Sequence, residues 1–353
     1  MRVLVTGSDG YIGSILGATL LERGLDVVGV DCGYYRDGWL FNDQRPRPLT
    51  LSKDIRRLTA KDVEGFDAVV HLAELSNDPL GEHDAAITYD INHHGSVNLA
   101  KACKAAAVPR FVYASSCSVY GAAEDGSARD ESAETKPLTA YAKCKVMVER
   151  DVGALADASF SPVFLRNATA FGASPRMRFD IVLNNLSGFA RTIKEIKMTS
   201  DGTPWRPLVH VEDICQAVAL ALAAPRERIH NEILNVGDDA QNYRVREIAE
   251  IVGKAFAGCS LSFGQHGGDN RSYRIAFAKI KRHLPGFQCR WTAERGANQL
   301  FEIFERIALT KEMFNFRAFT RIEQLKHLLA THQIDSSFYW RPAAEETARR
   351  RSA

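Results

Sequence analysis

The sequence predicts an α/β protein with a doubly wound parallel sheet and a smaller C-terminal α/β lobe. Short apolar stretches of strand character alternate with helical patterns through the first half of the chain, which is typical of parallel sheets covered by helices on both faces. A glycine-rich turn joins the first predicted strand to the first predicted helix. The length of 353 residues is enough for two domains of ordinary size.

The elements of the first half follow from their hydrophobic patterns. Residues 3–6 form a short apolar strand, and an apolar residue at every fourth position after it predicts a helix that ends at Gly24. Residues 25–31 (LDVVGVD) form the next strand. Further strands are predicted at residues 66–73, 110–116 and 161–165, and further helices at residues 85–107 and 141–155.

The second half is less regular. It contains two loops rich in Gly, Pro and Arg, at residues 172–178 and 200–207. Beyond them, a strand is predicted at residues 231–236, and helices are predicted at residues 245–256 and 297–314. This change in pattern indicates a second, smaller lobe rather than a continuation of the first sheet.

The domain boundaries follow from these patterns. We expect a first domain of residues 1–166, to which residues 206–237 return. Residues 167–205 and 238–340 would form the second lobe. Residues 341–353 are rich in charge and have no apolar anchor, so we expect them to form a mobile tail.

The composition excludes several classes of protein. Lys and Arg number 45 against 43 Asp and Glu, and the resulting net charge of +2 favours neither a nucleic acid nor a membrane surface as partner. No apolar stretch reaches the roughly 18 residues that a membrane span requires. The seven cysteines contain no C-x-x-C pair, so we expect neither disulfides nor a bound metal. Because no secretory signal precedes the first strand, we expect a cytoplasmic protein.

Three glycines between the first strand and the first helix have the spacing of a dinucleotide-binding turn. Gly7, Gly10 and Gly13 form G-x-x-G-x-x-G in the segment TGSDGYIG. One glycine allows the tight turn, another lets the backbone approach a pyrophosphate, and the third lets helix and strand pack closely. The pyrophosphate would then bind the free N–H groups at the positive end of the helix.

Asp31 ends the second predicted strand, where a carboxylate can bind the ribose hydroxyls of adenosine. A carboxylate there repels a 2′-phosphate, so the sequence favours NAD over NADP, although Arg36 could serve such a phosphate. Asp54 and Ile55 follow the next strand and are candidates for the adenine edge, with an ordinary surface position as the alternative. His71 lies near the end of the strand predicted at residues 66–73, and it is equally consistent with a packed core histidine and with a functional role.

Tyr141 and Lys145 form a Y-x-x-x-K pair, and residues four apart share one face of a helix. The lysine ammonium therefore lies near the phenol, whose ordinary pKa is about 10. The ammonium and a positive nicotinamide ring would lower this pKa, so that Tyr141 can accept a proton near neutral pH. Ser116, at the end of a predicted strand, could hydrogen-bond the same substrate hydroxyl.

Taken together, these features resemble the extended short-chain dehydrogenase/reductase superfamily, and within it the NAD-dependent nucleotide-sugar epimerase/dehydratase family. The resemblance extends over nearly the whole chain. It also rests on the segments 71–73 (HLA), 115–121 (SSCSVYG), 165–172 (LRNATAFG), 206–213 (RPLVHVED) and 234–237 (LNVG). It implies a Rossmann-type domain that binds NAD, a C-terminal substrate-binding lobe for a nucleoside-diphosphate sugar, and a homodimer formed through paired helices.

The resemblance also implies roles for individual residues. The catalytic residues would be Ser116, Tyr141 and Lys145. The residues in contact with NAD would be Gly7, Gly10, Tyr11, Ile12, Gly13, Asp31, Asp54, Ile55, Leu72, Ala73, Asn92, Tyr141 and Lys145. The residues in contact with the nucleotide sugar would be Asn167, Arg176, Arg178, Asn185, Arg206 and Arg271. Arg206 resembles the family's diphosphate-binding arginine. Arg176 and Arg178 could bind a diphosphate or a sugar substituent, although solvated loop charges are the favoured interpretation of both.

The residues just before Val119 bear on the reaction. In the family's 4,6-dehydratases an Asp-Glu pair stands at the positions of Cys117 and Ser118, and its decarboxylases carry a Glu at the position of Ser118. Neither residue here is a carboxylate, so the resemblance implies epimerisation through transient oxidation at C4 of the sugar. The alternatives are a C4 dehydrogenase or ketoreductase, a dehydratase or decarboxylase, and a non-catalytic NAD(H)-sensing protein.

Overall fold

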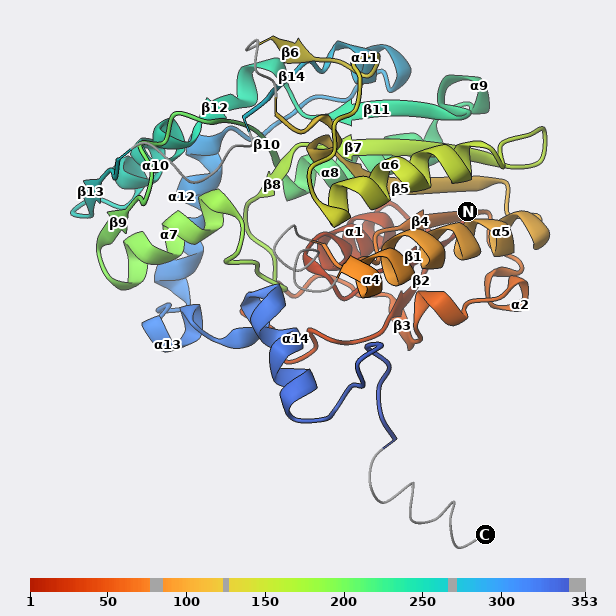
Figure 1. The fold of residues 1–353 in the computed structure, drawn as a ribbon, viewed down its shortest axis with the longest axis horizontal. Coiled ribbons are helices and arrows are strands. Elements are labelled where there is room, and N and C mark those ends of the chain that lie inside the picture. Colours follow the sequence, from red (N-terminus) through yellow and green to blue (C-terminus); the bar gives the residue numbers. More distant parts are fainter. Residues whose placement is uncertain (77–84, 123–126, 266–271, 343–353) are drawn as a thin grey trace, which may run out of the picture.

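The computed structural model describes residues 1–76, 85–122, 127–265 and 272–342, and a seven-stranded parallel sheet lies at its centre (Figure 1). The strands follow the order β11-β7-β5-β4-β1-β2-β3. Their bounds are β1 Arg2–Thr6, β2 Asp26–Asp31, β3 Leu49–Ser52, β4 Ala68–His71, β5 Arg110–Ser116, β7 Ser161–Asn167 and β11 Glu232–Val236. The order reverses between β1 and β4, and open α/β sheets bind ligands beyond the strand ends at such a point. The predicted fold class is confirmed.

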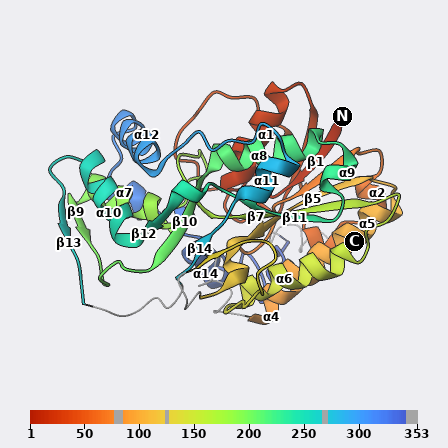
Figure 2. The same ribbon diagram turned by 90° about the horizontal axis from the view of Figure 1, so that it is seen from above.

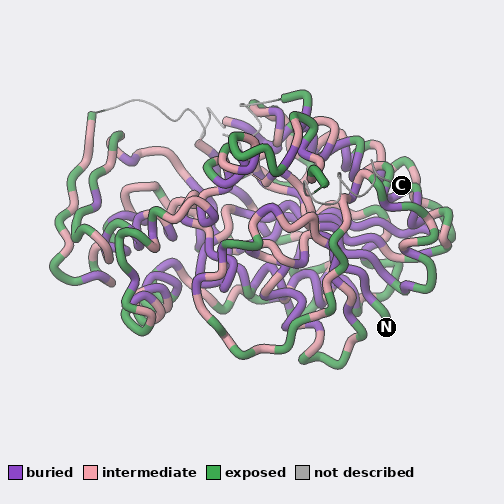
Figure 3. The backbone as a smooth tube through the Cα atoms, turned by 90° about the horizontal axis from the view of Figure 1, so that it is seen from below, coloured by how far each residue is buried: buried purple, intermediate pink, exposed green. Residues whose placement is uncertain are grey.

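Helices cover both faces of this sheet because its strands direct alternate side chains into two apolar layers. Val3 and Val5 of β1 pack into one layer, and Leu4 between them packs into the other. The central strands β1, β4, β5 and β7 are accordingly buried along most of their length, whereas the edge strand β3 is not (Figure 3). One face carries α1 (Tyr11–Glu22), α8 (Val211–Ala223) and α11 (Ala278–His283), and the other carries α2 (Ala60–Val63), α4 (Ala85–Thr88), α5 (Ser96–Ala105) and α6 (Ala140–Gly153), as Figure 2 shows.

A smaller lobe beside the large sheet contains short strands and four helices. Its three-stranded sheet consists of β12 (Asn242–Arg244), β10 (Trp205–His210) and β8 (Thr169–Phe171). Two-stranded sheets pair β13 (Ser260–Ser262) with β9 (Glu195–Lys197), and β14 (Arg274–Ile275) with β6 (Ala128–Arg129). The helices are α7 (Val182–Thr192), α10 (Val245–Ala255), α12 (Ala293–Arg306) and α13 (Lys311–Phe314).

Short helical segments connect these elements. A π-helical segment, η2 (Tyr89–Gly95), joins α4 to α5. The 3₁₀ turns are η1 (Ile55–Arg57), η3 (Cys117–Tyr120), η4 (Asp239–Gln241) and η5 (Arg317–Phe319). The remaining helices are α9 (Arg226–Ile229), which leads into β11, and α14 (Arg321–Ala330) near the C-terminus.

The chain after α13 returns to the large sheet. Gln324 of α14 donates from Nε2 to the carbonyl oxygen of Tyr34 at 2.9 Å, and Trp340 donates from Nε1 to the carbonyl oxygen of Cys32 at 2.6 Å. This C-terminal segment therefore lies against the loop that follows β2, although the sequence pattern assigns it to the second lobe. Within residues 206–237, α8 and β11 pack with the large sheet, whereas β10 pairs with β8 in the small one. Residues 343–353 of the expected tail lie outside the described residues.

Three further findings concern membrane-spanning helices, metal sites and the cysteines. Within the described ranges, none of the helices has the length and hydrophobicity needed to cross a bilayer. The same residues form no cluster of three or more His, Cys, Asp or Glu side chains able to hold a metal ion. All seven cysteines are free thiols.

Candidate functional site

A cavity of about 630 Å³ opens at the carboxyl ends of the central strands. Each of five strands contributes a lining residue at or just beyond its end: Gly7 after β1, Asp31 on β2, Leu72 after β4, Ser116 on β5 and Asn167 on β7. The cavity continues toward the smaller lobe along α7 and β10. It therefore lies where the strand order reverses and where both lobes can contact one ligand.

The cavity brings together most of the residues that the sequence predicts for a site. The predicted residues that line it are Gly7, Gly10, Tyr11, Ile12, Gly13, Asp31, Asp54, Ile55, Leu72, Ala73, Ser116, Tyr141, Lys145, Asn167, Arg178, Asn185 and Arg206. Asn92 and Arg176 lie outside the lining. Arg271 falls outside the described residues.

The turn between β1 and α1 requires glycine for steric reasons. Gly7 has a φ of +72°, and a Cβ there would lie 2.9 Å from the backbone nitrogen of Ala73. A Cβ on Gly13 would lie 2.0 Å from the carbonyl oxygen of Gly7. Gly10 precedes α1 and makes no side-chain cap, so the N–H groups of the first helical turn remain for a ligand. This cradle fits the pyrophosphate of a dinucleotide.

The carboxylate of Asp31 is held in place by the backbone. Its Oδ1 accepts from the N–H of Gly33 at 2.7 Å, and its Oδ2 accepts from the N–H of Asp9 at 3.1 Å. Burial raises the pKa of Asp31 above its ordinary value. Arg36, the alternative ligand for a 2′-phosphate, instead stacks on Trp340, with its guanidinium carbon 4.5 Å from the ring centre. This end of the cavity is suited to ribose hydroxyls.

Two buried polar residues have structural roles near the cavity. Asn92 fixes the loop after β4, since its Nδ2 donates to the carbonyl oxygen of Leu75 at 3.0 Å and its Oδ1 accepts from the N–H of Leu75 at 2.8 Å. His71 lies 2.6 Å from the hydroxyl of Thr6 and 2.8 Å from that of Ser96. Burial lowers the pKa of His71 to about 3, so its ring is neutral near neutral pH. Of its two interpretations, the packed core histidine agrees with the structure.

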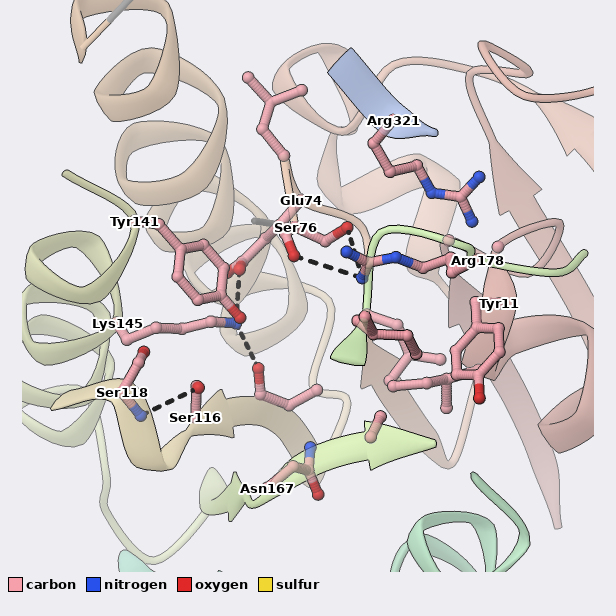
Figure 4. Close-up of a pocket in the computed structure, with 18 of the residues that line it drawn as sticks. Tyr11, Glu74, Ser76, Ser116, Ser118, Tyr141, Lys145, Asn167, Arg178 and Arg321 are labelled. Atoms are coloured by element: carbon pink, nitrogen blue, oxygen red, sulfur yellow. Dashed lines mark hydrogen bonds and ion pairs between the residues drawn. The ribbon is translucent and has the colours of Figure 1, made fainter. Parts of the chain in front are cut away.

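Ser116, Tyr141 and Lys145 face the same part of the cavity (Figure 4). Thr139 caps α6 by accepting from the N–H of Ala142 at 3.2 Å, so the helix begins just before Tyr141. Lys145 follows one turn later, and its Nζ lies 5.3 Å from the centre of the Tyr141 ring. Because Tyr141 is only partly buried, a ligand in the cavity can reach it.

The ammonium of Lys145 has two protein acceptors. Its Nζ donates to the carbonyl oxygen of Ala114 and forms an ion pair with Glu74. Tyr113 donates from its hydroxyl to Oε1 of Glu74 at 2.5 Å. Glu74 was not among the residues predicted from the sequence, although it lies three residues after the end of β4, at the ligand-binding edge of the sheet.

The two residues before Val119 contribute no carboxylate to the cavity. The thiol of Cys117 is buried and lies 3.1 Å from the carbonyl oxygen of Arg166, away from the lining. Ser118 does line the cavity, and its buried hydroxyl has no hydrogen-bond partner among the described residues. A ligand hydroxyl or a water molecule can therefore bind to Ser118.

The two predicted loop arginines differ in position. Arg176 donates from Nη1 to the carbonyl oxygens of Tyr35 and Arg36, at 2.9 Å and 2.7 Å, and its guanidinium stacks on Trp39. It holds the loop after β2 instead of lining the cavity. Arg178 does line the cavity, where its Nε lies 2.9 Å from Oδ1 of Asp180.

The remaining predicted substrate residues line the cavity from three elements. Asn167, at the end of β7, donates from Nδ2 to the carbonyl oxygen of Ser115 at 3.3 Å, and its buried Oδ1 has no partner among the described residues. Asn185 of α7 donates from Nδ2 to the carbonyl oxygen of Phe179 at 2.7 Å. Arg206 reaches the cavity from β10.

Arg321 is a further cavity residue, and it was not predicted from the sequence. Its side chain enters from the start of α14 and is 3% exposed (Figure 4). The guanidinium carbon lies 4.1 Å from the centre of the Tyr35 ring, and Nη1 donates to the carbonyl oxygen of Ala318 at 3.3 Å. No sequence pattern indicates this position, because it depends on the return of the C-terminal segment to the loop after β2.

The sequence of this chain is similar to those of a known family and of known enzymes. Residues 3–237 match the NAD dependent epimerase/dehydratase family. A UDP-glucose 4-epimerase of Bacillus subtilis is 29% identical over 350 residues, which cover 85% of this chain and 94% of the relative.

Two solved structures have the same fold. The UDP-glucose 4-epimerase of Thermus thermophilus in complex with NAD is 25% identical with a TM-score of 0.72, and the match covers 86% of this chain and 99% of that one. The dTDP-glucose 4,6-dehydratase DesIV of Streptomyces venezuelae, with NAD and TYD bound, is 25% identical with a TM-score of 0.76, and the match covers 87% of this chain and 97% of that one.

Proposed function

Since the chain belongs to the NAD-dependent epimerase/dehydratase family, we propose that it epimerises a nucleoside-diphosphate sugar by transient oxidation at C4. The observation that carries this proposal is that Ser116, Tyr141 and Lys145 share one cavity with the glycine turn. The same cavity receives no carboxylate from positions 117 and 118. Epimerisation at C4 needs the serine, the tyrosine, the lysine and a bound cofactor, and it needs no carboxylate at positions 117 and 118.

The residues of the cavity fit NAD, the family's cofactor. The backbone around Gly7, Gly10 and Gly13 leaves no room for a Cβ at the first and third positions, and it would hold the pyrophosphate. Asp31 would hold the adenosine ribose. Bound NAD supplies the two-electron oxidation of the sugar carbon and its reversal.

The protein's own residues would control the proton and the position of the sugar. Tyr141 as a phenolate accepts the proton of the C4 hydroxyl and later returns one. Ser116 hydrogen-bonds the same oxygen, and the ammonium of Lys145 favours the charged form of the phenol. The planar 4-keto sugar then turns in the cavity, so that reduction occurs on its opposite face.

Elimination and decarboxylation have less support because the cavity's other carboxylates have partners. Glu74 forms an ion pair with Lys145, and Asp180 accepts two hydrogen bonds from Arg178, at 2.9 Å and 3.1 Å. Asp31 lies at the end of the cavity assigned to adenosine. Among the described lining residues, no carboxylate stands at the position that the family's dehydratases use.

Product analysis tests the reaction. The purified protein is incubated with UDP-, dTDP-, GDP- and CDP-sugars, and the products are identified by mass spectrometry and NMR. We expect a product of unchanged mass with inverted configuration at C4, and a steady-state absorbance of reduced nicotinamide that stays flat. Loss of water, loss of carbon dioxide or stoichiometric change of that absorbance would each replace the proposal with a different reaction.

A matched pair of variants tests the proton acceptor. Tyr141→Phe removes the phenol hydroxyl and should abolish turnover of any accepted sugar nucleotide. Tyr89→Phe removes a hydroxyl from a half-buried tyrosine of η2 outside the lining and should leave turnover unchanged. Normal turnover by Tyr141→Phe would exclude the proposed mechanism. The homodimer stays a separate prediction, which sedimentation of the purified protein tests.

A further inference from the structure

Glu74 is a buried carboxylate in the catalytic cavity to which the proposed reaction assigns no role. Its side chain is 3% exposed, and that of its partner Lys145 is 4% exposed. One carboxylate oxygen pairs with the Lys145 ammonium, and the other accepts from the Tyr113 hydroxyl at 2.5 Å. Figure 4 shows Glu74 beside Lys145, with Tyr141 on the same side of the cavity. A charge in this position acts directly on the acid–base residues.

The groups that face Glu74 come from three elements. Lys145 is the one cation in direct contact with Glu74 among the described residues. The titratable neighbours of this ion pair are Tyr141 and Cys144 on α6, Tyr113 on β5, His71 at the end of β4, and Glu149 further along α6. Burial keeps the ring of His71 neutral, so the charged groups around Tyr141 are the pair of Glu74 and Lys145 and, from the loop before α7, the guanidinium of Arg178.

The ammonium of Lys145 carries three N–H groups, and the protein already uses two of them. The third remains for a ligand hydroxyl or for the phenolate. The paired carboxylate also cancels part of the field of the ammonium at Tyr141. A lysine shared with a carboxylate stabilises a neighbouring phenolate less than an unpaired lysine does.

We propose that Glu74 is a positioning residue that holds Lys145 and limits how strongly its ammonium stabilises the phenolate of Tyr141. The proposal rests on the function proposed above for Tyr141 and Lys145, and it adds a third member to that pair. The proposal predicts the direction in which each substitution changes the ionisation of Tyr141. Removal of the Glu74 charge makes Tyr141 easier to deprotonate, whereas removal of the Lys145 charge makes it harder.

The test follows the ionisation of Tyr141 without a sugar substrate. With NAD⁺ bound, the tyrosinate absorbance is titrated against pH in the wild type and in Glu74→Gln. In each background the corresponding Tyr141→Phe spectrum is subtracted, so that only Tyr141 contributes. We expect Glu74→Gln to lower the midpoint by about one to three pH units, the range for a charge within a few ångströms. An unchanged or raised midpoint would overturn the proposal.

Two further variants separate charge from packing. Glu74→Asp keeps the charge and should restore a midpoint close to that of the wild type, whereas a midpoint equal to that of Glu74→Gln would point to packing and overturn the proposal. Tyr113→Phe keeps Glu74 and removes one hydrogen bond, so a shift as large as that of Glu74→Gln would also contradict it. Because none of these titrations needs turnover, their outcome is independent of which sugar nucleotide, if any, the protein converts.

Discussion

Glu149 of α6 and Arg166 of β7 form a buried ion pair beneath the catalytic helix. Arg166 donates from Nε to Oε1 at 3.0 Å and from Nη2 to Oε2 at 2.7 Å, and the two side chains are 5% and 4% exposed. Ser115 also donates to Oε1, and the hydroxyl of Tyr120 accepts from Nη1 of Arg166. The network connects the helix that carries Tyr141 and Lys145 to two strands of the sheet, so it fixes the position of the catalytic residues.

We expect Arg166→Met to destabilise the fold strongly. Removal of one partner of a buried ion pair leaves an uncompensated charge, which costs about 3–5 kcal/mol of unfolding free energy. Arg150→Met is the control, because Arg150 pairs with Asp151 at the surface, where its side chain is 68% exposed, and little change is expected. Urea unfolding of both variants at neutral pH measures the difference. Similar stabilities of the two variants would show that the buried pair does not hold α6 in place.

The glycine turn allows a second prediction. Gly13→Ala introduces a Cβ 2.0 Å from the carbonyl oxygen of Gly7 and 2.7 Å from the Cα of Ser8, and both are backbone atoms. The turn must shift, so the affinity for NAD should fall roughly tenfold or more, which is about 1.4 kcal/mol per factor of ten. Titration calorimetry with NAD⁺ measures this loss.

The control for this substitution is Gly253→Ala in α10. Its nearest neighbour would be a leucine methyl group 4.0 Å away, an ordinary contact. Alanine at a helix interior should raise the unfolding free energy by about 0.5–1 kcal/mol and leave NAD affinity unchanged. Wild-type affinity of Gly13→Ala would mean that the turn does not bind the cofactor.

The buried histidine predicts how stability depends on pH. His71 has a pKa of about 3 in the fold and about 6.5 when unfolded, because burial disfavours its charged form. Between these values the unfolded chain binds a proton that the folded chain does not. Stability from this group is therefore complete above about pH 6.5, and it falls by about 1.4 kcal/mol per pH unit as the pH drops toward 3.

Urea unfolding from neutral pH to about pH 5 measures this slope. Burial also lowers the pKa of His210, to about 4. As the pH falls, two buried histidines of the wild type therefore lower its unfolding free energy. His71→Gln removes one of these two titrating histidines. The variant starts from a lower stability at neutral pH, since it loses the contacts to Thr6 and Ser96, but it should decline less steeply. Parallel curves for the two proteins would contradict the neutral state of His71.

The predictable part of the site is the part encoded by local spacing. The turn at Gly7, Gly10 and Gly13 and the helix pair Tyr141 and Lys145 each lie within one short segment, so their arrangement follows from turn and helix geometry alone. The parallel sheet follows from the alternation of strand and helix patterns, and it brings the strand ends together.

The unpredicted part depends on contacts between distant segments. Arg176 lies two residues before Arg178, yet it turns toward the loop at Tyr35, and no local pattern separates the two. Asn92 carries the same donor and acceptor groups whether it binds a cofactor or, as here, the backbone of Leu75. Arg321 reaches the cavity only because the C-terminal segment packs against the loop after β2.

That placement of Arg321 leads to a last prediction. The guanidinium is buried in the cavity wall, and no carboxylate of the described residues lies within 4.0 Å of it. A buried cation favours an anionic ligand group, and Arg321 interacts electrostatically with Arg178 and Asp180 as well as with Asp31. Its stacking partner Tyr35 belongs to the loop that follows β2, the strand that ends at Asp31. We therefore expect the diphosphate of NAD, rather than that of the nucleotide sugar, to bind near Arg321.

The expected effect of Arg321→Met is a loss of NAD affinity by roughly tenfold or more, the size of one charge-assisted hydrogen bond. Arg317→Met is the matched control, because Arg317 lies on the same C-terminal segment but pairs with Asp37 at the surface. Calorimetry with NAD⁺ and, separately, with UDP compares the two ligands. A loss confined to UDP would assign Arg321 to the nucleotide sugar, and unchanged affinity for both would leave it a structural role on Tyr35. Because Arg321→Met keeps the apolar contact with that ring, a folded variant with weak NAD binding isolates the contribution of the charge.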